Sequence, residues 1–143
     1  MIPARIGSQR LKKKNLALIN NKPLIEYVVD SSKKAKIFDK IYINSDDKIF
    51  KKIALKNNIG FYFRNKKIGS SNTKSDDVVY DFLKNNKFDI IVWVNPIAPL
   101  QEPKEIKKAI YFFIKNKLNS LVTTNQLKNH TIYKQKPLNF RIN

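Results

Sequence analysis

The chain has 143 residues, of which 42% are hydrophobic, and this is enough for one domain with a core. It has no run of about eighteen apolar residues, which excludes a typical transmembrane helix. The absence of cysteine excludes disulfides and thiol catalysis, and a single histidine excludes a metal site built from several histidines. The formal net charge of +18 would suit a nucleic-acid-binding protein, but only four of the 29 basic residues are arginines and the lysines are scattered, so an ordinary solvated basic surface is favoured.

Short β-rich stretches alternate with amphipathic helical stretches from the N-terminus onward. Residues 2–4 predict the end of a first strand, and residues 22–35 predict a helix with Pro23 in its first turn. A buried strand is predicted at 40–45, and Asp46 follows it in the position of a helix N-cap, a role that suits it better than that of a metal ligand.

The second half of the chain continues the same alternation. The predicted elements are a strand at 60–64, a helix that begins after an N-cap at Ser75, a strand at 89–96, a helix from Pro103 and a strand at 119–125. Strands separated by helices predict an α/β fold whose parallel sheet carries helices on both faces. Ligands of such sheets bind at the carboxyl ends of the strands, so candidate site residues are sought there. Trp93, in the most apolar strand, is assigned to the core.

The first fifteen residues, MIPARIGSQRLKKKN, place a glycine and several donors directly after the first strand. Gly7 permits a tight turn whose backbone N–H groups can surround an anion. The donors near it are Arg5, Ser8, Arg10, Lys14 and Asn15. The two arginines and Lys14 can offset the charge of a polyphosphate, and Asn15 can read a base or a ribose. A lysine-rich surface turn is the alternative, because the loop matches neither the GxGxxG nor the Walker pattern.

Plain structural roles are also open to the other polar residues at predicted strand ends. Arg64 can be a surface arginine, Ser75 can be an N-cap and nothing more, and Asn95-Pro96 can simply end a strand. A loop role is favoured over catalysis for the isolated His130.

The N-terminal segment resembles the nucleotide-binding loop of the acylneuraminate cytidylyltransferases, or CMP-sugar-acid synthetases. Their pattern IPAR-x-GS-x-R-x-x-x-KN is matched here by Ile2-Pro3-Ala4-Arg5, Gly7-Ser8, Arg10 and Lys14-Asn15. The likeness runs collinearly through further stretches of the chain, at 20–29, 37–47, 61–79, 94–106 and 119–130.

The resemblance implies one nucleotide-binding domain over 1–143, with a Rossmann-like three-layer α/β/α fold of the nucleotide-diphospho-sugar transferase type. It implies transfer of CMP from CTP to a nonulosonic sugar acid of the sialic, legionaminic or pseudaminic type, which gives a CMP-sugar and pyrophosphate. The expected setting is CMP-sialic acid synthesis for a cell-surface polysaccharide, in the cytoplasm, because no membrane segment or signal peptide is visible. The implied partners are CTP, a nine-carbon sugar acid and, in the full-length form, a second copy of the protein; the implied cofactor is Mg²⁺.

The resemblance also implies roles for individual residues. Arg5 and Lys14 are expected to be catalytic and, with Ser8, to hold the triphosphate. The expected nucleotide-binding set is Ala4, Arg5, Gly7, Ser8, Lys14, Asn15, Arg64 and Ser75. Asn95 and Pro96 are expected to lie at the sugar acid or the reacting phosphate.

The chain departs from the family pattern in three places. Asn95, Ile97, Ala98 and Gln101 replace the Gln, Thr, Ser and Arg of the family's QPTSPLR stretch, which predicts a different sugar acid or a weaker enzyme. The family's dimerisation segment and acidic IDxxxD-like metal motif are not found in these residues, and strand one is short before Pro3. These points predict a truncated, N-terminal portion whose activity alone is open. The alternative is a non-enzymatic basic module that binds nucleic acid or other polyanions.

Overall fold

The computed structural model describes residues 1–8, 11–70, 72–124, 132–133 and 136–137. Its main elements are β1 (Ile2–Ala4), α1 (Leu24–Ala35), β4 (Tyr42–Ser45), α2 (Ile49–Lys56), β5 (Gly60–Phe63), α3 (Ser75–Lys84) and α4 (Pro103–Lys115). Two 3₁₀ turns, η1 (Lys14–Leu16) and η2 (Lys66–Gly69), and the short strands β2 (Leu18–Ile19), β3 (Lys22–Pro23), β6 (Ile132–Tyr133) and β7 (Lys136–Pro137) complete the list.

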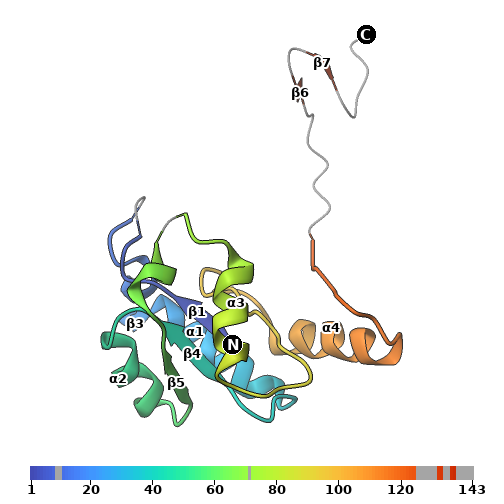
Figure 1. Ribbon diagram of the computed structural model, residues 1–143, viewed down its shortest axis with the longest axis horizontal. Coiled ribbons are helices and arrows are strands. Elements are labelled where there is room, and N and C mark those ends of the chain that lie inside the picture. The colour runs from blue at the N-terminus through green and yellow to red at the C-terminus, as the bar shows by residue number, and fades with distance from the viewer. Residues whose placement is uncertain (9–10, 71, 125–131, 134–135, 138–143) are drawn as a thin grey trace.

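A parallel sheet of order β1-β4-β5 forms the centre of the domain (Figure 1). Ile2 lies opposite Ile43, and Tyr42 lies opposite Gly60. Each connection between these strands contains a helix, as a parallel pairing requires. The carboxyl ends of all three strands therefore meet at one edge of the sheet.

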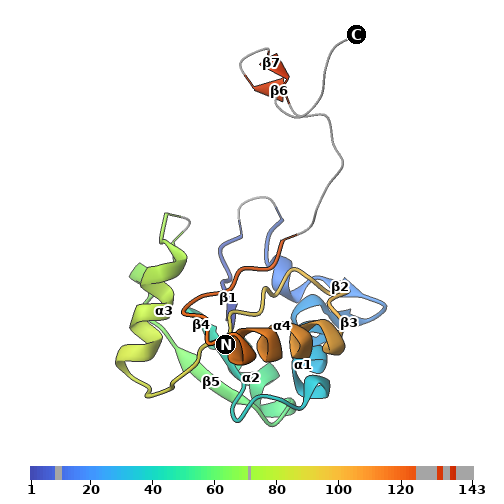
Figure 2. The same ribbon diagram turned by 90° about the vertical axis from the view of Figure 1, so that its right-hand side faces the viewer.

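The two faces of the sheet carry separate apolar clusters. Ile43 belongs to the larger one, with residues of α1, α2 and α4, while the next residue back, Tyr42, packs with α3 residues such as Phe82. This alternation is the period of two that a strand imposes. Figure 2 shows α1 beside α4 and α3 on the other side of the sheet. The three-layer α/β/α prediction is confirmed.

The stretch predicted as a strand at 89–96 runs alongside β1 but is not a regular strand. The Met1 ammonium donates to the Val92 carbonyl over 2.8 Å, and the Val94 N–H donates to the Met1 carbonyl over 3.0 Å. Pairing goes no further because the next two bonds of a parallel ladder would need N–H groups from Pro3 and Pro96, and proline has none. Burial lowers the pKa of the Met1 amino group to about 6.

Two helix starts differ from the prediction. Asp46 is not the cap of α2: the chain makes an extra bend after β4, and the Asp47 carboxylate instead accepts the Ile49 N–H over 2.8 Å. Ser75 is the first residue of α3, whose N-cap position is held by Lys74 without a side-chain hydrogen bond. The helix from Pro103 is confirmed, with a capping box between Glu102 and Glu105.

The predicted strand at 119–125 is wrong for its described part. Residues 119–124 form no strand in the structure, and Val122 is 81% exposed, so no neighbouring strand covers it. Residue 125, Arg10 and His130 lie outside the described residues. No helix in the described ranges is long and apolar enough to cross a bilayer.

Candidate functional site: a pocket at the carboxyl ends of the strands

A pocket of about 290 Å³ opens at the carboxyl edge of the sheet. It is bounded by the loop after β1, by η1, by the residue after β5, by the segment from η2 to α3, and by residues 93–97. The volume is at the lower end of the range for small-molecule sites. The sheet edge therefore carries a cavity where parallel α/β folds commonly hold ligands.

The sequence-predicted site residues converge on this pocket. The structure brings together Ala4, Arg5, Ser8, Lys14, Asn15, Arg64, Ser75, Asn95 and Pro96 as lining residues. Gly7 is the one member of the predicted set that does not line it. The grouping is a finding of the structure, whereas the role of each residue stays a prediction.

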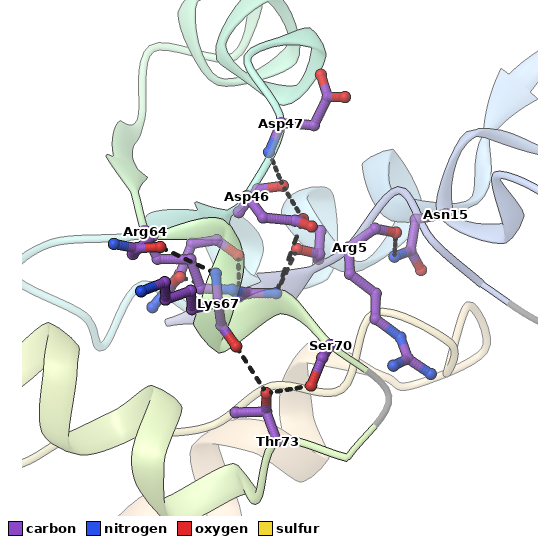
Figure 3. Close-up of polar contacts among 12 residues, drawn as sticks. Arg5, Asn15, Asp46, Asp47, Arg64, Lys67, Ser70 and Thr73 are labelled. Carbon is purple, nitrogen blue, oxygen red and sulfur yellow. Dashed lines mark hydrogen bonds and ion pairs between the residues drawn. The ribbon is translucent and has the colours of Figure 1, made fainter.

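One side of the pocket has cationic side chains that form no hydrogen bond or ion pair within the described residues. The side chains of Arg5, Ser8 and Lys14 make no hydrogen bond or ion pair with any part of the chain that the structure describes, and all three are partly exposed. Figure 3 shows the Arg5 side chain extending away from the strand, with no contact drawn to its guanidinium. These donors are available to an anion.

The turn at Gly7 differs from the prediction. Gly7 does not have a positive φ, and an added Cβ would meet open space, so the turn itself does not require glycine. The N–H of Ser8 donates to the Ile6 carbonyl over 3.0 Å, which removes one of the main-chain donors expected to face an anion. Side chains, more than backbone N–H groups, therefore provide the donors on this side of the pocket.

Asn15 places a buried acceptor at the pocket. Its side chain is 5% exposed, and its Nδ2 donates to the Arg5 carbonyl over 3.4 Å. Its Oδ1 is buried and has no partner among the described residues. A buried polar atom without a partner is costly, and a ligand donor such as an amino group would satisfy it.

Arg64 is a buried arginine, not the surface residue of the plain structural alternative. It is 4% exposed, and its Nη2 donates to the Ala4 carbonyl over 3.0 Å. Its Nη1 donates to both the carbonyl and Oδ1 of Asn44, over 2.9 and 3.0 Å. The guanidinium thus joins the ends of β1 and β4. Burial lowers its pKa from the usual value, a trend that the nearby Asp46 carboxylate opposes.

The opposite wall of the pocket was missed by the sequence analysis, apart from Ser75. It is formed by Ile68, Gly69, Ser70 and Thr73, and the Ser70 and Thr73 hydroxyls lie 2.9 Å apart (Figure 3). A hydroxyl-rich stretch between a strand and a helix, at 70–75, was the available signal. The described residues of this wall that line the pocket have hydroxyls and apolar groups but no cation.

Trp93 is not a core residue. It is 38% exposed and lines the pocket, because Val92 and Val94 take the alternate positions that face the core. Asn95 both ends the extended stretch and lines the pocket: its Oδ1 accepts the Ile97 N–H over 3.3 Å. The position of Asn95 at the end of the stretch is thus observed, while its contact with a substrate stays a prediction.

Comparison with known proteins places the chain in a family. A family model described as cytidylyltransferase matches residues 1–140. The chain belongs to the cytidylyltransferase family. The chain is similar to the N-acylneuraminate cytidylyltransferase of Streptococcus agalactiae serotype V, 27% identical over 135 residues, which cover 91% of this chain and 32% of that protein. It is also similar to the pseudaminic acid cytidylyltransferase of Campylobacter jejuni, 30% identical over 134 residues, which cover 90% of this chain and 58% of that protein.

Solved cytidylyltransferase structures share the fold. A CMP:2-keto-3-deoxy-manno-octonic acid synthetase, solved in complex with CTP, superposes with a TM-score of 0.72 at 19% identity, over 81% of this chain and 46% of that one. A cytidylyltransferase from Leptospira borgpetersenii superposes with a TM-score of 0.66 at 26% identity, over 81% of this chain and 48% of that one. The chain thus spans about a third to somewhat over half of the relatives that it matches. The resemblance inferred from the sequence is confirmed at the level of the family.

Proposed function

We propose that the pocket binds CTP and that the protein transfers CMP to a nine-carbon sugar acid, releasing pyrophosphate. In that reaction the anomeric hydroxyl of the sugar acid attacks the α-phosphorus, and the bond from that phosphorus to the pyrophosphate oxygen breaks. The main support for the proposal is the convergence of Arg5, Ser8 and Lys14, whose side chains have no polar partner among the described residues, on a pocket at the carboxyl ends of the strands. Family membership supports the nucleotidyl transfer.

The free cations suit the triphosphate and the departing pyrophosphate. Negative charge grows on the leaving group as its bond breaks, and donors already in place stabilise that charge without rearrangement. Arg5 and Lys14 would supply two positive charges on this side, and Ser8 a hydroxyl donor. This assigns them to catalysis as well as to binding.

The base is assigned to Asn15, which follows Lys14 in η1, and the ribose to the hydroxyl-bearing wall opposite. The Oδ1 of Asn15 is a buried acceptor that an exocyclic amino group, which cytosine has and uracil lacks, would satisfy. Arg64 lines the pocket but its Nη atoms are engaged with the sheet, so we assign it to shaping the floor more than to gripping the nucleotide. Asn95 and Pro96, at the other rim, are assigned to the sugar acid.

The described residues do not fit a magnesium site. They contain no group of three or more His, Cys, Asp or Glu side chains able to hold a metal, and none of the described residues that line the pocket is acidic. Magnesium in nucleotide sites is held by one or two carboxylates together with substrate phosphates. The family's use of Mg²⁺ is therefore not assigned to these residues, and no step is derived through the ion.

Ligand-dependent thermal unfolding tests the proposal. We expect CTP to raise the melting temperature of the 1–143 polypeptide more than ATP or GTP does at equal concentration, because a pocket this small discriminates against purines. At a hundredfold excess over Kd, binding stabilises the folded state by about 2.7 kcal/mol. Inorganic tripolyphosphate at equal concentration is the control for charge alone. Equal shifts with all three nucleotides would favour a general polyanion-binding module instead.

A further inference from the structure

Asp46 lies directly beneath the pocket wall formed by Ile68, Gly69, Ser70 and Thr73. A Cβ added to Gly69 would come within 2.5 Å of the Asp46 Oδ2 and within 2.8 Å of its Cβ and Cγ. Gly69 does not have a positive φ, so its backbone conformation does not demand glycine. Glycine is required here for lack of space, because the Asp46 side chain occupies the volume that the Cβ of any other residue at 69 would need.

The same side chain also faces the arginine at the pocket floor. Its Oδ1 lies 4.0 Å from the Arg64 Nη2, and the Asp46 side chain is 12% exposed. The Ser45 Oγ, at the end of β4, lies 3.5 Å from the same Oδ1 (Figure 3). Asp46 is therefore held between the end of a core strand and the pocket wall.

Asp46 has contacts with Arg64 and with Gly69, and the distances show which of them constrains its side chain more. An ion pair of 4.0 Å is at the limit of such contacts, and Arg64 is already fixed by shorter bonds to Asn44 and Ala4. Packing against Gly69, in contrast, leaves no room for a single methyl group. Contact with the wall is therefore the stronger constraint on Asp46.

The wall is the side of the pocket that suits an uncharged ligand part. Ser70 and Thr73 present hydroxyls there, next to Ile68, whereas Arg5 and Lys14 are cations without a polar partner in the described ranges. A nucleoside triphosphate in this pocket would put its phosphates toward those cations and its ribose toward the wall.

We propose that Asp46 is a positioning residue, which fills the space beneath Gly69 and so sets the place of the wall that receives the ribose of the ligand. This rests on the proposed binding of CTP. Because the side chain at 46 is required for its volume, Asp46→Asn should preserve CTP binding, whereas Asp46→Ala should weaken it.

Calorimetric titration of folded variants with CTP and with inorganic tripolyphosphate tests the proposal. We expect Gly69→Ala and Asp46→Ala each to weaken CTP binding about tenfold, the effect of a contact worth about 1.4 kcal/mol. Tripolyphosphate, which has no nucleoside, should bind each variant within about twofold of the wild-type affinity. Asp46→Asn, of nearly equal volume, should keep CTP affinity within about threefold.

The double variant Asp46→Ala/Gly69→Ala provides the matched control. The new methyl at 69 would take the space that the carboxylate leaves, so the double variant should bind CTP more tightly than either single variant. Additive losses, or equal losses for CTP and tripolyphosphate, would overturn the proposal. If the wild type binds CTP and both single variants bind it equally well, this inference fails and the proposed function stands. Failure of the wild type to bind either ligand would overturn both.

Discussion

Replacing Arg64 with alanine is expected to lower the free energy of unfolding by at least about 1–3 kcal/mol, the usual cost of leaving a buried hydrogen-bonding group without its partner. Its guanidinium is the donor to the Ala4 carbonyl and to two oxygens of Asn44, all in the buried ends of β1 and β4. The substitution leaves those acceptors unpaired and opens a cavity. Urea denaturation followed by circular dichroism measures the change.

Two further variants test whether the loss of stability in Arg64→Ala comes from the guanidinium group. Arg64→Lys keeps a positive charge but cannot span both strands with one ammonium group, so it should recover only part of the loss. Lys66→Ala, an exposed position two residues away, should change the free energy of unfolding by no more than about 0.5 kcal/mol. Wild-type stability of Arg64→Ala would show that the guanidinium is not what holds the strand ends together.

Replacing Arg5 with alanine is expected to give the opposite pattern: normal stability and a large loss of CTP binding. Its side chain makes no hydrogen bond or ion pair with the described part of the chain and is partly exposed, so the fold should depend on it little. A hydrogen bond to a charged group contributes about 1.5–3 kcal/mol, which corresponds to a loss of CTP affinity of roughly tenfold to a hundredfold. Arg5→Ala/Lys14→Ala should lose more than either single variant. Calorimetric titration measures the affinities.

The control for the double variant Arg5→Ala/Lys14→Ala must also remove two positive charges. Lys51→Ala/Lys52→Ala removes two exposed lysines from α2, neither of which lines the pocket. If CTP binding falls equally in this control, general attraction to a basic surface explains the affinity, and the specific role of the N-terminal loop is wrong.

The fold was predictable because its signals are local and repeated. Alternation at Tyr42 and Ile43 marks a strand with two buried faces, and the apolar spacing of α1 and α4 marks amphipathic helices. The stretch at 89–96 has the same apolar character, yet its pairing with β1 ends where Pro3 comes to lie beside it, because proline has no N–H to donate. A pattern within one segment does not contain that information.

The convergence of these residues on one pocket was predictable, but the contacts that each side chain makes there were not. Residue types at strand ends indicated which side chains would converge, because the carboxyl ends of parallel strands share an edge. Whether an arginine is free, as Arg5 is, or bound to carbonyls, as Arg64 is, depends on tertiary distances between strands. The placement of Asp46 under Gly69 likewise joins segments 23 positions apart, and no local pattern indicates it.

A crystal structure of the chain with bound CTP tests the central claim most directly. We expect the triphosphate oxygens to lie within hydrogen-bond distance of Arg5, Ser8 and Lys14, about 2.7–3.2 Å, and the cytosine to face the Asn15 Oδ1. CTP bound elsewhere, or bound here with these side chains directed into solvent, would contradict it.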